Sequence, residues 1–141
     1  MSRRPALYAI LAALVVAFAF VIARPALSAT TPVKIMPLGD SITGSPGCWR
    51  ALLWNRRQLS GVTDLVCVGS RPPPGCAVSF VGDHEGHGGI LATNRANQNQ
   101  LPPWLAATKP DIVVMHLGTN DVWSNLAPAT ILAAFSTLVD Q

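Results

Sequence analysis

The chain has 141 residues, 50% of them hydrophobic, with 10 basic and 7 acidic side chains. This length leaves room for one domain at most. Arg3, Arg4 and Arg24 lie in the first 29 residues, and the remainder holds seven basic and seven acidic side chains. Such a neutral remainder lacks a basic patch that would attract nucleic acids, so we expect no nucleic-acid partner.

Residues 1–29 have the layout of a secretory signal. Two arginines precede an uncharged apolar stretch over 6–23, and small residues follow up to Ala29. This order is typical of signal peptides, so we expect cleavage after Ala29, with Ala23 as the alternative, and a secreted domain over 30–141. The apolar stretch also reaches the lower length limit of a membrane span. An uncleaved anchor on the outer face is therefore the second reading, and the only contact with a membrane that we expect.

The rest of the chain alternates between strand-like and helix-like segments. Short apolar runs predict strands at 33–38, 64–69 and 111–117. Helices are expected at 49–59, 93–100, 102–107 and 128–138, and the first of them has Trp49, Leu52, Leu53 and Arg56 spaced to face a sheet. The segment 70–89, rich in proline and glycine, is expected to be a long loop. This alternation predicts an α/β fold in which helices cover both faces of a parallel sheet.

Two of the predicted strands end in polar residues. Gly39-Asp40-Ser41 follows the strand at 33–38, and Gly118-Thr119-Asn120-Asp121 follows the strand at 111–117. Open α/β sheets bind ligands at the carboxyl edge of their strands, so both groups of residues are candidates for a site. A serine nucleophile needs donors for a developing oxyanion and a base for its proton. The plain alternatives are a helix-capping role for Ser41 and an Asx turn at Asn120.

These two groups resemble the sequence blocks of the SGNH (GDSL) hydrolases. The first is similar to the block that carries the nucleophile, and the second to the asparagine block. The resemblance implies a three-layer, flavodoxin-like fold with Ser41 as nucleophile and the Asn120 amide as an oxyanion donor. Asp40 would shape the turn and Asp121 would brace its loop. The family's strand order places the 33–38 strand between the other two, so the two loops meet at the point where ligands bind.

Segment 83–89 gives a narrower resemblance. It is similar to the Glu-Gly-His-x-Gly segment of carbohydrate esterase family 3, acetylxylan esterases within the SGNH group, and the likeness runs from about residue 34 to 138. On this match Gly89 supplies the third oxyanion N–H, with Gly88 as second choice, and His87 positions the loop. The alternative is a metal-binding loop. Metal sites usually gather ligands from several fixed elements, so we expect neither a metal nor a cofactor.

The base expected of this family has no match in the chain. SGNH hydrolases use an Asp-x-x-His pair near the carboxyl end, and no such spacing occurs here. We therefore expect that pair to lie beyond Gln141 and the 141 residues alone to have doubtful activity. We interpret His84 as a solvated loop residue and His116 as packed beside the site or in the core. Without further strands, the strand at 111–117 is an open apolar edge that recruits other chains.

The three cysteines suggest one disulfide and one free thiol. Cys48 and Cys76 lie in loops containing glycine and proline, whereas Cys67 lies in an apolar run. We favour a bridge between Cys48 and Cys76. The rival pairing of Cys67 with Cys76 closes a shorter loop.

The combined prediction is a secreted serine esterase that deacetylates xylan or a related polysaccharide through an acyl-Ser41 intermediate. One alternative is a lipase-like or lysophospholipase-like GDSL hydrolase with a longer acyl substrate. Another is a truncated, non-catalytic carbohydrate-binding or surface protein. Trp123 follows the asparagine block directly and is expected either to line the acyl or sugar site or to be an ordinary structural residue.

Overall fold

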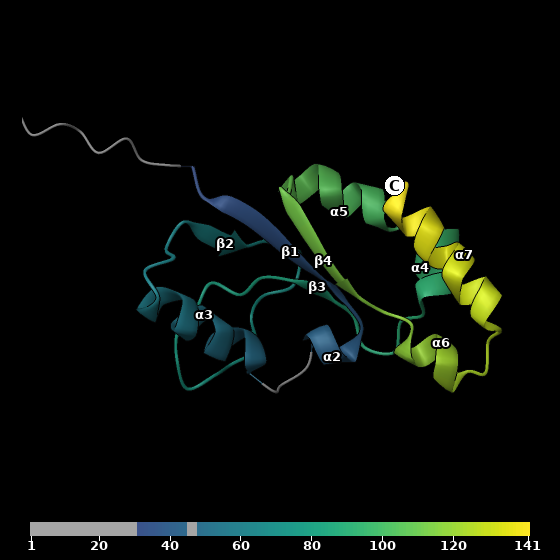
Figure 1. Ribbon diagram of the computed structural model, residues 1–141, viewed down its shortest axis with the longest axis horizontal. Coiled ribbons are helices and arrows are strands. Elements are labelled where there is room, and N and C mark those ends of the chain that lie inside the picture. Colours follow the sequence, from purple (N-terminus) through teal and green to yellow (C-terminus); the bar gives the residue numbers. More distant parts are fainter. Residues whose placement is uncertain (1–30, 45–47) are drawn as a thin grey trace, which may run out of the picture. The chain divides into compact units, whose positions relative to one another are not determined.

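Four strands and six helices make up the part of the chain that the structure describes. The computed structural model describes residues 31–44 and 48–141, so the predicted leader lies outside the described residues (Figure 1). The strands are β1 (Val33–Gly39), β2 (Leu65–Cys67), β3 (Glu85–Gly86) and β4 (Ile112–His116). The helices are α2 (Ser41–Gly44), α3 (Trp49–Leu59), α4 (Ala92–Asn97), α5 (Leu101–Thr108), α6 (Thr119–Trp123) and α7 (Pro128–Val139). None of these helices is long and apolar enough to cross a membrane.

All strand pairings in the sheet are parallel, and β1 lies at its centre. β2 pairs with the start of β1, in the register Val33 to Leu65, and β3 pairs with its last two residues. β4 pairs with β1 from Ile35 to Gly39. This stretch overlaps the registers of both β2 and β3, so β4 must lie along the opposite edge of β1 (Figure 1). The predicted position of the first strand between the other two is therefore the observed one.

Alternate residues of β1 supply two different layers. Met36 and Leu38 are fully buried on the face covered by α4, α5 and α7. The buried residues packed with them are Ala92, Ala96, Leu101, Leu117, Ala134 and Leu138. Ile35 and Pro37 point to the other face, toward α3. Successive side chains of a strand point to opposite faces of the sheet, so β1 contributes to both layers. The parallel pairings and the helices on both faces confirm the predicted mixed α/β fold.

Helix α3 has the predicted bounds but turns a different face to the sheet. Arg50 and Ala51 are its buried residues, whereas Leu52 is 67% exposed and Arg56 is also exposed. Arginine can bury its long apolar stem, and here two inward guanidinium groups stack over tryptophan rings of the same helix. The expectation that Leu52 and Arg56 face the sheet was wrong. The spacing of apolar residues does not reveal that Arg50 and Arg57 turn toward the sheet instead.

The cysteines pair as the sequence favoured. The structure joins Cys48, directly before α3, to Cys76 in the loop that follows β2. Cys67 is a half-buried free thiol at the end of β2, and burial raises its pKa. The disulfide therefore ties α3 to the long segment between β2 and β3.

The outer edge of the sheet is apolar. Among the described residues β4 pairs with β1 alone, and Ile112, Val113 and Val114 are 48%, 38% and 55% exposed. A strand with an unpaired edge and exposed apolar side chains is a template for pairing with other chains. The open edge expected from the sequence is present in the structure.

Candidate active site

Ser41 is the first residue of α2, directly beyond the carboxyl end of β1, and its side chain is exposed. The helix approaches the sheet by backbone contacts. A methyl group at Gly39 would lie 2.1 Å from Thr43 Oγ1, and one at Gly86 would lie 2.3 Å from the backbone nitrogen of Gly44. Only glycine permits such a close approach. The glycines before, within and beside the short helix therefore fix the place of Ser41.

Asp40 and Asn120 connect the loops that follow three strands. Asp40 is buried, and its Oδ1 accepts the N–H of Ile42 at 2.8 Å, which holds the turn into α2. Asn120 Nδ2 donates to the carbonyl oxygen of Ile90 at 2.8 Å and to Asp40 Oδ2 at 3.4 Å. The turn that carries Ser41, the glycine-rich loop and the asparagine block therefore converge at one edge of the sheet.

The amide of Asn120 can change its partner. A primary amide has two N–H groups, and at rest they point to Ile90 and Asp40. The bond to Asp40, at 3.4 Å, lies at the long limit for hydrogen bonds and is the weaker of the two. A negatively charged oxygen of a ligand can replace this contact while the bond to Ile90 holds the side chain in place.

Asp121 braces this arrangement from within the protein. Its carboxylate is fully buried and accepts the backbone N–H groups of Ala92 at 2.7 Å and Thr93 at 3.1 Å, and the Thr93 hydroxyl at 2.8 Å. These donors belong to the first turn of α4, where backbone N–H groups lack helical partners and a negative charge is favoured. The residue after Asn120 therefore anchors the asparagine block to the segment that follows the glycine-rich loop.

Of the two glycines proposed as donors, Gly88 lies against Ser41. A methyl group at Gly88 would lie 3.9 Å from Ser41 Cβ, whereas one at Gly89 would meet nothing within 4 Å. Gly89 has a φ of 74°, in the left-handed region. The structure thus places the second choice from the sequence nearer to the serine than the first.

His87 is held by a network that the sequence did not reveal. Its backbone N–H donates to the carbonyl of Gly39 at 2.9 Å, and its Nε2 lies 2.9 Å from the fully buried Glu85 carboxylate. Arg71 approaches its Nδ1 at 3.4 Å and can only donate, so Nδ1 accepts and Nε2–H donates to Glu85. Its ring stacks on Trp104, 4.8 Å between centroids. His87 is therefore held between the end of β1, the buried Glu85 and the Trp104 ring.

The chain is similar to known esterases in sequence and in structure. No family model matches it. A multidomain esterase of Ruminococcus flavefaciens is 30% identical over 67% of this chain and 15% of its own length. Two crystal structures, an acetyl esterase variant with acetate and a carbohydrate esterase family 3 protein from Talaromyces cellulolyticus, are each 38% identical with a TM-score of 0.69. Both matches cover 77% of this chain and 54% of the solved chain.

The fold extends this likeness to a wider group. The SGNH-hydrolase family esterase AlinE4 has a TM-score of 0.50 at 18% identity, over 77% of this chain and 52% of its own, which is a likeness of fold alone. The chain is therefore similar to carbohydrate esterase family 3 and shares its fold with an SGNH-hydrolase esterase. It spans about half the length of these solved relatives.

The other two histidines differ from expectation. His84 is 4% exposed rather than solvated, and its Nδ1 accepts the N–H of Gly86 at 2.9 Å. Burial, with a smaller effect of the Arg50 charge, lowers its pKa to about 4. His116, expected to be packed, is exposed on β4 because β4 is uncovered on its outer side. Neither ring is hydrogen-bonded to Ser41 within residues 31–44 and 48–141.

The histidines of the glycine-rich loop are already engaged within the protein. His84 contacts backbone groups and His87 contacts Glu85. Throughout the described segments, no group of three or more histidine, cysteine, aspartate or glutamate side chains is arranged to hold a metal ion. In the described part of the chain, these histidines thus hold the loop's own backbone and side chains.

Two functional contacts escaped the sequence analysis. Glu85 joins Ser70 to His87, accepting from the Ser70 hydroxyl at 2.9 Å. Trp104 lies between the His87 ring and the Arg95 guanidinium, which is 4.2 Å from the indole centroid, rather than serving only as a core residue of its helix. The one sequence signal for the contact between Glu85 and His87 was their spacing of two residues, because residues i and i+2 of an extended segment lie on the same side. Trp123 is 88% exposed on α6 and packs into no core.

Proposed function

We propose that this chain is part of an SGNH-type hydrolase that cleaves carboxylic esters, with Ser41 as the nucleophile. The observation that carries the proposal is the amide of Asn120, which contacts both the residue before Ser41 and the residue after Gly89. A hydroxyl at an exposed helix start, glycine N–H groups and a carboxamide donor then border one site. These are the nucleophile and the oxyanion donors that acyl transfer requires.

The reaction proceeds by two transfers of the acyl group. Ser41 Oγ attacks the carbonyl carbon, and the carbonyl oxygen becomes an oxyanion that accepts hydrogen bonds from the Ser41 N–H, the Gly89 or Gly88 N–H and the Asn120 amide. The intermediate collapses, expels the alcohol and leaves the acyl group on Ser41. Water then attacks this ester and releases the carboxylic acid. Asn120 exchanges its weak bond to Asp40 for the oxyanion and regains it afterwards.

A base must take the Ser41 proton. The chain contains no Asp-x-x-His spacing, and among the described residues no histidine ring forms a hydrogen bond with Ser41. Oxyanion donors alone still accelerate acyl transfer when a member of the triad is absent, by about 10³-fold over water. We therefore propose slow intrinsic acylation by these 141 residues, which an external base accelerates.

The test is acetylation of Ser41 by p-nitrophenyl acetate, with and without imidazole as the external base. Intact mass followed by peptide mapping separates Ser41 from the two lysines. We expect acetyl-Ser41 in the unaltered chain and none in Ser41→Ala. Asn120→Ala should slow acylation by about 10²- to 10³-fold, the usual loss for one oxyanion donor. The matched control is Asn94→Ala, since Asn94 is exposed on α4.

Two results would refute this role. If imidazole leads to labelling of the lysines but not of Ser41, then Ser41 is not the nucleophile. Equal acylation rates in Asn120→Ala and Asn94→Ala would show that the Asn120 amide does not stabilise the oxyanion. Either result leaves the fold assignment intact.

We further propose that the natural substrate is an acetylated polysaccharide such as xylan, met outside the cell after secretion. Support comes from the relatives, an acetyl esterase and a family 3 carbohydrate esterase, and from Trp123, whose exposed ring can stack on a sugar. Comparing p-nitrophenyl acetate with p-nitrophenyl decanoate tests the acyl preference. Faster acylation by the decanoate would favour a lipase-like enzyme instead.

A further inference from the structure

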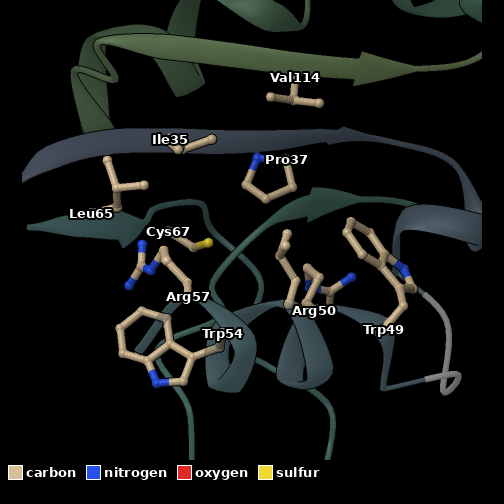
Figure 2. A pocket seen from close by; sticks show the side chains of 10 residues that line it. Ile35, Pro37, Trp49, Arg50, Trp54, Arg57, Leu65, Cys67 and Val114 are labelled. Carbon is tan, nitrogen blue, oxygen red and sulfur yellow. The ribbon is translucent and has the colours of Figure 1, made fainter. Parts of the chain in front are cut away.

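A cavity lies on the face of the sheet away from the layer formed by α4, α5 and α7. It encloses about 340 Å³ between α3 and the strands β1, β2 and β4. Figure 2 shows Ile35, Pro37 and Val114 on its sheet side, with Arg50 and Arg57 on the α3 side. Small-molecule sites in proteins typically measure roughly 300–1,000 Å³. The walls are apolar side chains, so two cations are the exceptional feature of this cavity.

The two cations find few partners among residues 31–44 and 48–141. Arg50 is 5% exposed, and all three of its guanidinium nitrogens are buried without a hydrogen bond. Arg57 has two such nitrogens, Nε and one terminal nitrogen. Their carbon centres lie 5.4 Å and 4.3 Å from the rings of Trp49 and Trp54, which orients the groups but satisfies none of their donors. A buried guanidinium that forms no hydrogen bond is costly, because arginine keeps its charge.

The chain has no carboxylate to satisfy them. All seven acidic residues lie within the described segments, because residues 1–30 and 45–47 contain none. Within those segments the one ion pair joins Glu85 to His87. The charge of Asp83 is felt at Cys67, but it forms no ion pair with either arginine. Within residues 31–44 and 48–141, therefore, no carboxylate neutralises either arginine.

We propose that this cavity binds a monocarboxylate with an apolar body, such as a medium-chain aliphatic acid. The carboxylate would accept hydrogen bonds from Arg50 and Arg57, and the body would lie against Ile35, Leu53 and Val114. A carboxylate matches the planar fork of arginine and forms short, charge-assisted bonds with it. An inorganic anion would satisfy the charges and leave the apolar walls empty. This site is separate from Ser41 and independent of ester cleavage.

The probe is sodium octanoate, added to the 141-residue chain at neutral pH. Trp49 and Trp54 line the cavity and report binding by fluorescence, and Cys67, the free thiol, lies in the same wall. We expect saturable quenching and parallel protection of Cys67 from a thiol reagent. 1-Octanol and octylammonium should bind at least about 10-fold more weakly, because octanol has no negative charge to pair with the two cations and octylammonium adds a positive one. Acetate has the charge without the body and should bind weakly as well.

Variants separate the charge from the rest of the cavity. Arg50→Gln should weaken octanoate binding by about 10- to 100-fold, and Arg57→Gln by about 10-fold. Arg56→Gln is the matched control, since Arg56 lies on the same helix but is exposed, and it should change the affinity less than twofold.

Three outcomes would overturn the proposal. They are equal affinity for octanoate and octanol, equal binding by Arg50→Gln and Arg56→Gln, or no saturable signal below about 10 mM. If Arg50→Gln does not fold, the comparison of octanoate with octanol on the unaltered chain decides the question. None of these results depends on acylation of Ser41.

Discussion

Replacing Asp121 should separate the asparagine block from the rest of the site. In Asp121→Ala, the N–H groups of Ala92 and Thr93 and the Thr93 hydroxyl lose their acceptor at a buried helix start. A hydrogen bond to a charged group contributes about 1.5–3 kcal/mol, but these three share one carboxylate and are not additive. We expect a loss of about 3–5 kcal/mol in the free energy of unfolding, typical of removing one partner of a buried charged contact.

Asp121→Asn should cost about half as much. An amide oxygen can still accept from Thr93, but the NH₂ group then faces the N–H of Ala92. With a urea m-value of about 1.5 kcal/mol/M, the alanine variant should lower the unfolding midpoint by about 2–3 M. The matched control is Asp140→Asn at the exposed end of α7. An alanine variant with the same midpoint as this control would refute the bracing role.

Three further predictions concern stability. The pKa of His84 is 6.5 in the unfolded chain and about 4 in the folded one, so the unfolded chain binds more protons between these pH values. Urea unfolding should therefore show that the free energy of unfolding falls by up to about 3 kcal/mol as the pH drops from 6.5 to 4. Gly86→Ala should cost about 1–3 kcal/mol and slow acylation of Ser41, because the methyl group would strike the backbone of Gly44. Cys76→Ser opens a disulfide that closes a separation of 28 residues and should cost about 3–4 kcal/mol in urea unfolding.

Each of these has its own check. A His84→Gln variant that keeps the full pH dependence would assign it to another group. Gly75→Ala is the control for Gly86, since nothing lies within 4 Å of a methyl group there. Equal stability of these two glycine variants would contradict the close approach of α2 to β3. Unchanged unfolding of the unaltered chain in a reducing agent would argue against the disulfide.

The parts of the fold that follow from local patterns were predictable. Short apolar runs located β1, β2 and β4, and the sheet edge at which Ser41 and Asn120 meet follows from parallel pairing. β3 escaped prediction because a strand of two residues has no periodicity of its own. It pairs with the last two residues of β1, and Gly86 leaves room there for the backbone of α2.

Contacts between distant residues were the harder part of the site. Asp121 accepts from donors 28 and 29 residues away, and no local pattern announces such a cap. His84 resembles a solvated loop histidine in sequence but is buried, because an isolated pairing with Arg71 folds its segment back on itself. Burial of polar groups is decided by tertiary contacts, which composition and spacing do not contain.

The glycine contacts beneath α2 have an evolutionary consequence. Since backbone atoms alone make the approach between Gly44 and Gly86, the distance of α2 from β3 at this contact does not depend on side-chain volume. The outward position Ile42, half exposed beside the serine, can therefore vary without displacing it. Selection can change what a substrate meets here while the attacking atom stays where the main chain puts it.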